Sequence, residues 1–209
     1  PNALPSEVPI FPLEGATLLP RTQLPLNIFE PRYIHMIDDA LSSHRLIGMV
    51  QPDGYEVHNA PTIYNVGCVG RIVSFSETSD NRYIISLAGV SRFEVIRELD
   101  TQLAYRKVHV RYDPYAHDFV ASDDFTYDDR DAFMTKLKSY FSKENIDADW
   151  ENLQNARPED VVNMLSIVCP FAPEEKQALI EAMRVEDRYQ TLKTIIEMSW
   201  TSSGHESIN

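Results

Sequence analysis

The chain has 209 residues, 43% of them hydrophobic, which is enough apolar material for one large domain or two small ones. Its formal net charge is −13, and this negative field disfavours nucleic acids and anionic membrane surfaces as partners. No stretch approaches the roughly 18 apolar residues of a membrane-spanning helix, and the N-terminus lacks a signal-peptide pattern, so we expect a soluble, cytoplasmic protein.

Residues 1–112 have the pattern of a β-rich domain, with a net charge of only −2 and every glycine except Gly204. Prolines interrupt the apolar runs at residues 8–13 and 23–29. Because proline cannot donate to a sheet from a central strand, we expect short edge or bulged strands there. Further strands are predicted at residues 45–50, 66–75, 83–87, 93–99 and 105–112, with a hairpin turn at 79–82.

One amphipathic helix is expected within this β-rich part. From Glu30 onward the apolar period changes, because side chains three and four positions apart now fall on one face: Tyr33, Met36, Ile37, Ala40 and Leu41. Six or seven strands with a single helix favour a small, partly closed β-barrel over residues 1–112.

Residues 113–209 are more acidic, with a net charge of −11. Residues 113–127 contain Pro114 and several aspartates with little periodicity, so an acidic linker is predicted there. Helices are predicted at residues 130–141, 158–168, 173–183 and 186–200. The sequence therefore predicts an α+β protein with a β-barrel domain at 1–112 and an α-helical bundle domain at 128–209.

No motif for catalysis or for cofactor binding is present. The glycines stand singly and fit neither GxxxxGK[ST] nor GxGxxG, and no GxSxG elbow occurs. Cys68 and Cys169 lie far apart and outside any CxxC pair, so neither a disulfide framework nor a zinc site is indicated. We predict no catalytic residue, no cofactor and no enzymatic activity.

Two patterns have the spacing of metal ligands. His35, Asp38 and Asp39 lie three and four positions apart on the predicted helix, although adjacent acids on a surface helix are usually solvated. Residues 147–151 resemble the start of a calcium loop, but Asn152 replaces the required glycine and Pro158 stands where the bidentate glutamate belongs. We predict no metal site at either place.

Two charged residues stand inside apolar neighbourhoods, Glu30 in FEPRY (29–33) and Arg92 in GVSRF (89–93). A carboxylate in such surroundings needs a hydrogen-bonded cation, because an isolated buried charge costs several kcal/mol, on the order of 3–5. Glu30 is therefore predicted to pair with Arg92 or with Arg32 and to fix the helix against the barrel.

These segments resemble the Lon N-terminal domain family, also called the Lon substrate-binding domain, and especially its stand-alone members. The similarity covers about residues 7–200 and runs in order through VPIFPL (8–13), LLP (18–20), LPLNIFEPRY (24–33), IGMV (47–50), VGCVGRI (66–72), GVSRF (89–93) and PFAPEEKQALIE (170–181). The sequence departs from the usual pattern at Arg21, where glycine is common, and at Leu19, where phenylalanine is common.

The resemblance implies a PUA-like β-barrel followed by a helical bundle. It also implies binding of unfolded or partner polypeptide, whereas the ATPase and Ser-Lys protease modules of full-length Lon have no counterpart in these 209 residues. An extended peptide could add to an open strand edge, and the strands near Pro9 and Pro25 are the candidate edges.

Two alternative functions remain open. PUA-like barrels include RNA-binding members, and the candidate basic cluster consists of Arg92, Arg97, Arg106, Lys107 and Arg111. Acidic residues are interleaved with that cluster, which disfavours RNA. A weak ATP-independent peptidase is the other alternative, for which the sequence offers no nucleophile.

Overall fold

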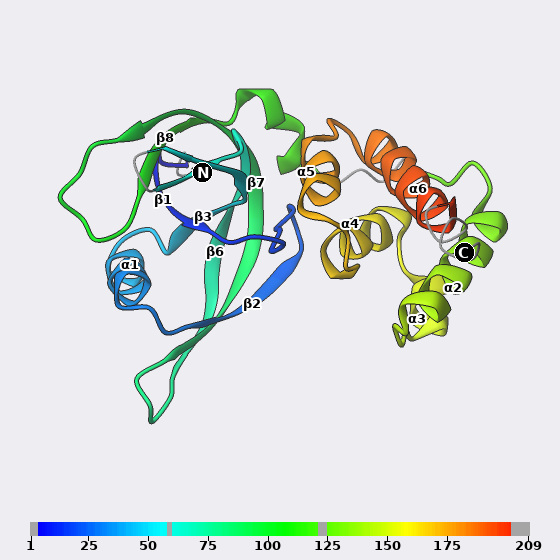
Figure 1. Cartoon of the computed structure of the whole chain (residues 1–209), viewed down its shortest axis with the longest axis horizontal. Coiled ribbons are helices and arrows are strands. Elements are labelled where there is room, and N and C mark those ends of the chain that lie inside the picture. The colour runs from blue at the N-terminus through cyan, green and yellow to red at the C-terminus, as the bar shows by residue number, and fades with distance from the viewer. Residues whose placement is uncertain (1–3, 58–59, 121–124, 202–209) are drawn as a thin grey trace, which may run out of the picture. The chain divides into compact units, whose positions relative to one another are not determined.

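The computed structural model describes residues 4–57, 60–120 and 125–201, which form two compact units (Figure 1). The first unit combines the described residues of Pro1–Ala121 with Pro170–Glu181, and the second combines those of Ser122–Cys169 with those of Ala182–Asn209. Strands and helices are both well represented, so the predicted α+β class is confirmed.

The first unit contains the strands of the molecule's described part: β1 (Glu7–Pro12), β2 (Gln23–Ile28), β3 (Leu46–Val50), β4 (Pro52–Val57), β5 (Ala60–Ile63), β6 (Val66–Glu77), β7 (Tyr83–Leu99) and β8 (Lys107–Arg111). Its helices are α1 (Pro31–Leu41), the 3-10 helix η1 (Asp113–Phe119) and α5 (Pro173–Glu181). The segments predicted as two strands at 83–87 and 93–99 are one continuous strand, β7. The short pair β4–β5 was not predicted.

Five of these strands close into a barrel. The large sheet has the order β2-β7-β6-β3-β1-β8, and β8 also pairs with β7. The long strand β7 achieves this because its first half pairs with β2 and β6, whereas its last residues turn to pair with β8. Register shifts in β6 and β7 accompany the bending, as expected where a sheet curls.

The prediction that the strand containing Pro9 is an edge is wrong. β1 lies between β8, with which it runs antiparallel, and β3, with which it runs parallel. Pro9 is tolerated because the pairing with β3 begins only at Ile10, one residue later. The strand containing Pro25 does lie at an edge, because β2 pairs with β7 alone within the large sheet.

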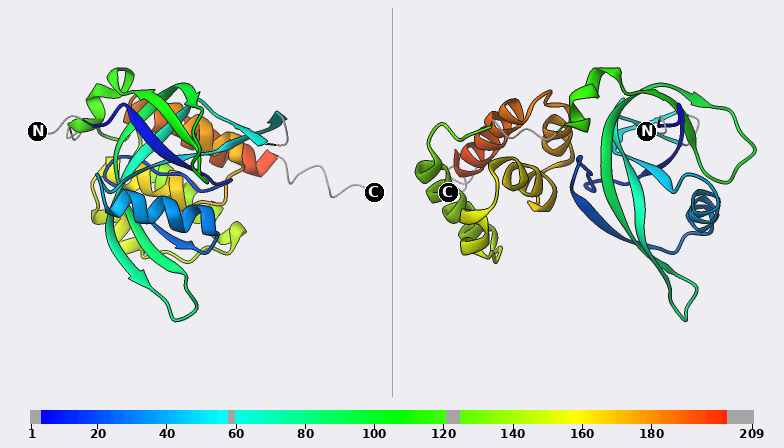
Figure 2. Two further views of the ribbon diagram at one scale, coloured as in Figure 1. Left: turned by 90° about the vertical axis from the view of Figure 1, so that its left-hand side faces the viewer. Right: turned by 180° about the vertical axis from the view of Figure 1, so that it is seen from behind.

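Two apolar cores form in the first unit. One fills the interior of the barrel with side chains of the five closed strands, including Ile10, Phe93 and Val108. The other includes the buried face of α1, where Met36 and Ile37 are completely inaccessible, together with Leu26 and Ile28 of β2. The helix lies beside the strands, and the β6–β7 hairpin extends beyond them (Figures 1 and 2).

The second unit contains α2 (Arg130–Glu144), α3 (Trp150–Asn155), α4 (Pro158–Val168) and α6 (Val185–Thr201). An aromatic cluster at its centre brings Phe133 within 5.1 Å and Tyr127 within 5.3 Å of the Tyr189 ring, measured between centroids. The segment that resembles a calcium loop begins α3 instead, because Asp149 caps this helix by accepting the Asn152 amide.

The grouping of segments differs from the predicted domains 1–112, 113–127 and 128–209. Residues 121–124 of the predicted linker, and the ends of the other two ranges, lie outside the described residues. Residues 113–119 form η1 and group with the barrel, as does α5, which was predicted to join the helical bundle.

Helix α5 is held to the barrel unit by buried polar groups. Gln177 accepts a hydrogen bond from the Gln51 side-chain amide and donates one to the Val66 carbonyl, at 3.2 and 3.1 Å. The Lys176 ammonium donates to the Gly15 carbonyl at 2.8 Å. Such groups would each lose a hydrogen bond if the helix left the barrel.

No helix in the described part of the chain combines the length and apolar composition needed to span a bilayer.

We predict that Asp128 stabilises the second unit in a pH-dependent way. Lys193 and Tyr189 donate hydrogen bonds to its carboxylate at 2.6 and 2.5 Å, which holds the Asp128 pKa well below its usual range. A carboxyl whose pKa is lower in the folded than in the unfolded chain stabilises above about pH 4. Asp128→Asn should therefore lower Tm near pH 7, and the difference from the wild type should shrink as the pH falls below about 4.

Circular dichroism melts near pH 7 and near pH 3 measure this difference. Asp131→Asn is the matched control, since it removes an acid from the same helix end without touching Lys193 or Tyr189. An Asp128→Asn deficit that stays constant across this pH range would contradict the prediction.

Candidate functional site

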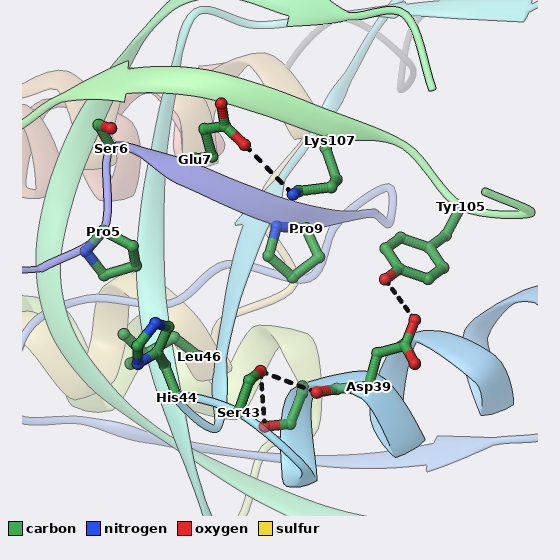
Figure 3. Close-up of a pocket in the computed structure, with 11 residues that line it drawn as sticks. Pro5, Ser6, Glu7, Pro9, Asp39, Ser43, His44, Leu46, Tyr105 and Lys107 are labelled. Carbon is green, nitrogen blue, oxygen red and sulfur yellow. Dashed lines mark hydrogen bonds and ion pairs between the residues drawn. The ribbon is translucent and has the colours of Figure 1, made fainter. Parts of the chain in front are cut away.

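A pocket of about 440 Å³ opens in the barrel unit beside the C-terminal end of α1 (Figure 3). It is lined by the end of α1 and the loop after it, by β1 and the residues before it, and by the segment that enters β8. Pro5, Pro9 and Leu46 supply apolar wall, and charged or hydroxyl groups surround them. Its volume falls in the range of small-molecule or side-chain sites.

A hydrogen bond from Tyr105 to Asp39 fixes one end of this pocket. The Tyr105 hydroxyl donates to Asp39 Oδ2 at 2.7 Å, and Figure 3 shows the two side chains pointing toward each other at one side of the pocket. Burial raises the pKa of Tyr105, and the neighbouring carboxylate raises it further, so the phenol stays a donor. A second, smaller pocket of about 240 Å³ lies beyond this pair and shares both residues.

Several polar groups of the pocket are held by hydrogen bonds or ion pairs within the protein and are not activated for catalysis. The Ser43 hydroxyl donates to the carbonyls of Asp39 and Ala40, at 2.8 and 3.4 Å, so its proton is directed to the main chain. Glu7 and Lys107 pair with each other at 3.3 Å across the adjoining strands. A nucleophile needs a base within hydrogen-bonding reach, and Ser43 has backbone carbonyls there instead.

The two candidate metal patterns hold no ligand set. In the described ranges, no group of three or more His, Cys, Asp or Glu side chains is placed to coordinate a metal ion. Asp38 accepts a hydrogen bond from the Tyr83 hydroxyl at 3.0 Å, and Asp39 accepts one from Tyr105. Asp38 thus connects α1 to β7, and Asp39 connects α1 to the segment that enters β8.

Of the two partners predicted for Glu30, the structure pairs it with Arg32 and places Arg92 against another carboxylate. Glu30 pairs with Arg32 at 2.7 Å, and about half of each side chain is exposed. Arg92 is buried and contacts neither of them, since its carboxylate partner is Asp118 of η1. The Glu30–Arg32 pair lies at the surface, so it contributes little to fixing the helix, below about 1 kcal/mol.

Arg92 joins three segments of the barrel unit. Its backbone amide and its guanidinium both donate to the Asp118 carboxylate, at 2.8 Å in each case. A further N–H donates to the Ile180 carbonyl at the end of α5, also at 2.8 Å. The guanidinium lies 4.4 Å from the centre of the Tyr115 ring and donates to His117 Nε2 at 3.0 Å. Arg92 is therefore a structural residue.

Sequence reasoning missed Asp118 because it falls in the segment predicted as a solvated linker. The sequence signal for a buried Asp118 was the presence of two aromatic residues near it, Tyr115 and Phe119, in an otherwise acidic stretch. Only the fold brings Asp118 to Arg92, 26 positions away.

The candidate basic cluster does not form a free cationic face. Arg106 pairs with Glu98 at 2.7 Å and Arg111 pairs with Glu94 at 2.8 Å. Lys107 pairs with Glu7, and Arg92 is buried against Asp118. Binding of phosphates would have to displace these carboxylates, which weakens the case for RNA.

Exposed apolar side chains gather at the end of the β6–β7 hairpin and the adjacent end of β2. We name this set the hairpin patch, and it consists of Phe29, Phe75 and Ile84. They are 63%, 41% and 48% exposed, respectively. Asn27 pairs with Ile84 across the strands, so Phe29, two positions later, lies on the same face as Ile84. Phe75 lies on the other face, with its ring centre 4.8 Å from that of Tyr83.

Comparison with protein families gives one match that spans most of the chain. Residues 7–197 match the model of the ATP-dependent protease La (LON) substrate-binding domain. Among curated proteins, a Lon protease of Dictyoglomus thermophilum is 34% identical over 109 residues, which cover 51% of this chain and 14% of that protein. A Lon protease of Magnetococcus marinus is 24% identical over 215 residues, covering 94% of this chain and 25% of that protein.

Solved structures show the same fold. A Lon N-terminal domain protein from Xanthomonas campestris superposes with a TM-score of 0.63 at 19% identity, covering 90% of this chain and 97% of that one. The N-terminal domain of a Mycobacterium avium complex Lon protease gives a TM-score of 0.64 at 14% identity, covering 91% and 98%. The chain spans between about an eighth and a quarter of the length of the curated relatives it matches.

We predict that breaking the Arg92–Asp118 pair destabilises the protein far more than breaking the Glu30–Arg32 pair. Arg92→Ala leaves the Asp118 carboxylate buried without its cation, which should lower the free energy of unfolding by about 3–5 kcal/mol. Arg32→Ala should lower it by less than about 1 kcal/mol. Urea unfolding followed by circular dichroism measures both losses, because the two tryptophans, Trp150 and Trp200, belong to the second unit and do not report on the barrel. Equal losses for the two variants would contradict the assignment of Arg92 as a structural residue.

Proposed function

Because the chain belongs to the ATP-dependent protease La (LON) substrate-binding domain family, we propose that it is a non-catalytic module that binds unfolded or partner polypeptide. The family description supports this class of ligand. The pocket beside α1 supports the non-catalytic part of the proposal, because the Ser43 hydroxyl there donates to backbone carbonyls.

The observation that carries the proposal is the hairpin patch. Large apolar side chains that stay exposed together mark surfaces for binding other molecules, because each of them gains free energy when it is removed from water. Phe29 and Ile84 are exposed on one face of this end of the barrel unit, and Phe75 is exposed on the other face. Unfolded polypeptides present apolar side chains that folded proteins hide, so they are the ligand this patch selects.

Charge agrees with a polypeptide more than with a nucleic acid. The protein has a formal net charge of −13, and four of the five residues in the candidate basic cluster are paired with carboxylates. A ligand held by apolar contact and main-chain hydrogen bonds is insensitive to that charge.

We predict saturable binding of fluorescently labelled, permanently unfolded casein, measured by anisotropy. The affinity should change little between low and moderate salt, because burial of apolar surface is not screened. The casein should remain intact during the titration, as checked by gel electrophoresis. A structured RNA serves as the control ligand and should bind weakly or lose its binding steeply with salt.

Phe29→Ser tests the patch directly and should weaken casein binding by about five- to tenfold. Tyr55→Ser is the matched control, since Tyr55 is an exposed aromatic on β4, away from the patch, and should leave the affinity unchanged. Absence of casein binding by the wild type, or binding followed by cleavage that survives repurification, would overturn the proposed function.

A further inference from the structure

Among the described strands of the large sheet, β2 is the one that has a strand neighbour on one side only along its whole length. Each strand of the closed barrel has at least two strand neighbours, whereas β2 pairs with β7 alone. Closing the barrel leaves β2 open along its whole length, and it also leaves the end of β6 after Ile72 paired with β7 alone, although that stretch ends in the charged Glu77. Unpaired backbone groups at an open edge form a template for an added strand.

The hydrogen-bonding pattern identifies which backbone groups face outward. The amide of Thr78 donates to the Arg82 carbonyl at the hairpin turn, at 2.9 Å. Because backbone groups of successive residues point to opposite sides of a strand, this bond fixes which residues of β7 bond β6 and which bond β2. Even-numbered residues of β7 near the turn then bond β6, and odd-numbered ones bond β2. The Gly89 amide, which donates to the Thr22 carbonyl at 2.9 Å, extends the same pattern to the start of β2.

It follows that the even-numbered residues of β2 direct their amides and carbonyls to β7. Gln23, Pro25 and Asn27 direct theirs to the open side, and all three are exposed. Pro25 has no N–H, so the edge offers two donors and three acceptors. A proline at this position removes one donor and so disfavours edge-to-edge aggregation, while the remaining groups can still pair with an added strand.

The surroundings of the edge suit an extended chain of apolar character. β2 carries no charged residue, so nothing on it repels an incoming backbone by charge. Phe29, at the end of β2, lies on the face that Asn27 shares with Ile84, where a side chain of an added strand would pack against it. The pair β4–β5 also has open edges, but its register is broken between Pro52 and Glu56.

We propose that β2 docks an extended segment of unfolded polypeptide by strand addition, with the outward groups of Gln23, Pro25 and Asn27 bonding its main chain. This rests on the polypeptide binding proposed above and assigns it a strand. Main-chain hydrogen bonds give affinity with little dependence on ligand sequence, and Phe29 of the hairpin patch favours an apolar side chain where the ligand packs against it.

The proposal predicts that one added or removed backbone donor changes casein affinity in opposite directions. Pro25→Thr restores an outward N–H and should tighten binding by about fivefold, the effect of one net hydrogen bond. Asn27→Pro removes an outward N–H and should weaken binding by about the same factor. Asn27→Thr keeps the N–H and is the matched control, with unchanged affinity expected. Circular dichroism melts confirm that each variant folds.

Hydrogen exchange followed by NMR supplies a second measurement on the wild-type chain. The amides of Gln23 and Asn27 should exchange fast in the free protein and become protected when casein binds, whereas those of Leu24 and Leu26 should be protected throughout. Casein binding with no change at Gln23 and Asn27, and with equal affinity for Pro25→Thr and wild type, would overturn the assignment to β2 while leaving the proposed function intact. Failure of the wild type to bind casein would overturn both.

Discussion

The buried pair of Arg92 and Asp118 sets the architecture of the barrel unit. Arg92 is 1% exposed and Asp118 is 5% exposed at the side chain, so neither charge could remain there without the other. Arg92 lies on β7, Asp118 lies on η1, and the carbonyl of Ile180 at the end of α5 accepts a third bond. Because one guanidinium on β7 bonds groups of both η1 and α5, these two later segments must lie against the barrel.

The same pair explains how the sequence tolerates arginine at position 21. Arg21 has φ = +64°, in the left-handed region where glycine is favoured, at a cost on the order of 1 kcal/mol. Its guanidinium donates to the Asp118 carbonyl at 2.7 Å, a charge-assisted bond of about 1.5–3 kcal/mol that offsets this strain. Gly89 cannot change in the same way, because an added Cβ would lie 1.9 Å from the Leu19 carbonyl oxygen.

Local periodicity was sufficient to predict the elements that bury one regular face. Helix α1 was predicted because its buried residues recur every three or four positions, and α4 begins at the proline expected for a first turn. Strand β4 escaped prediction because its side chains are exposed or only partly buried and show no alternation. Strand β7 was divided in two because Gly89 in its interior resembles a strand end.

The predictions that failed depend on contacts between distant residues. The sequence pointed to Glu30 and Arg92 as charges in apolar surroundings, but Glu30 lies at the surface and the partner of Arg92 stands in an acidic segment. Helix α5 has the composition of a bundle helix, yet Lys176 and Gln177 bond carbonyls of the barrel. No single-sequence pattern distinguishes a polar residue that reaches water from one that reaches a distant carbonyl.

Barrel closure and an open edge have the same origin in β7. This strand is long enough to close the barrel through β8 with its last residues while its first residues hold β2 outside the ring. The closed strands gain stability from a core filled on the inside, and β2 contributes Leu26 and Ile28 to the other core through one face only. β2 is thereby anchored on one side and unpaired on the other. A docking strand needs both properties, since a rigid strand binds a flexible chain with less entropy lost on its own side.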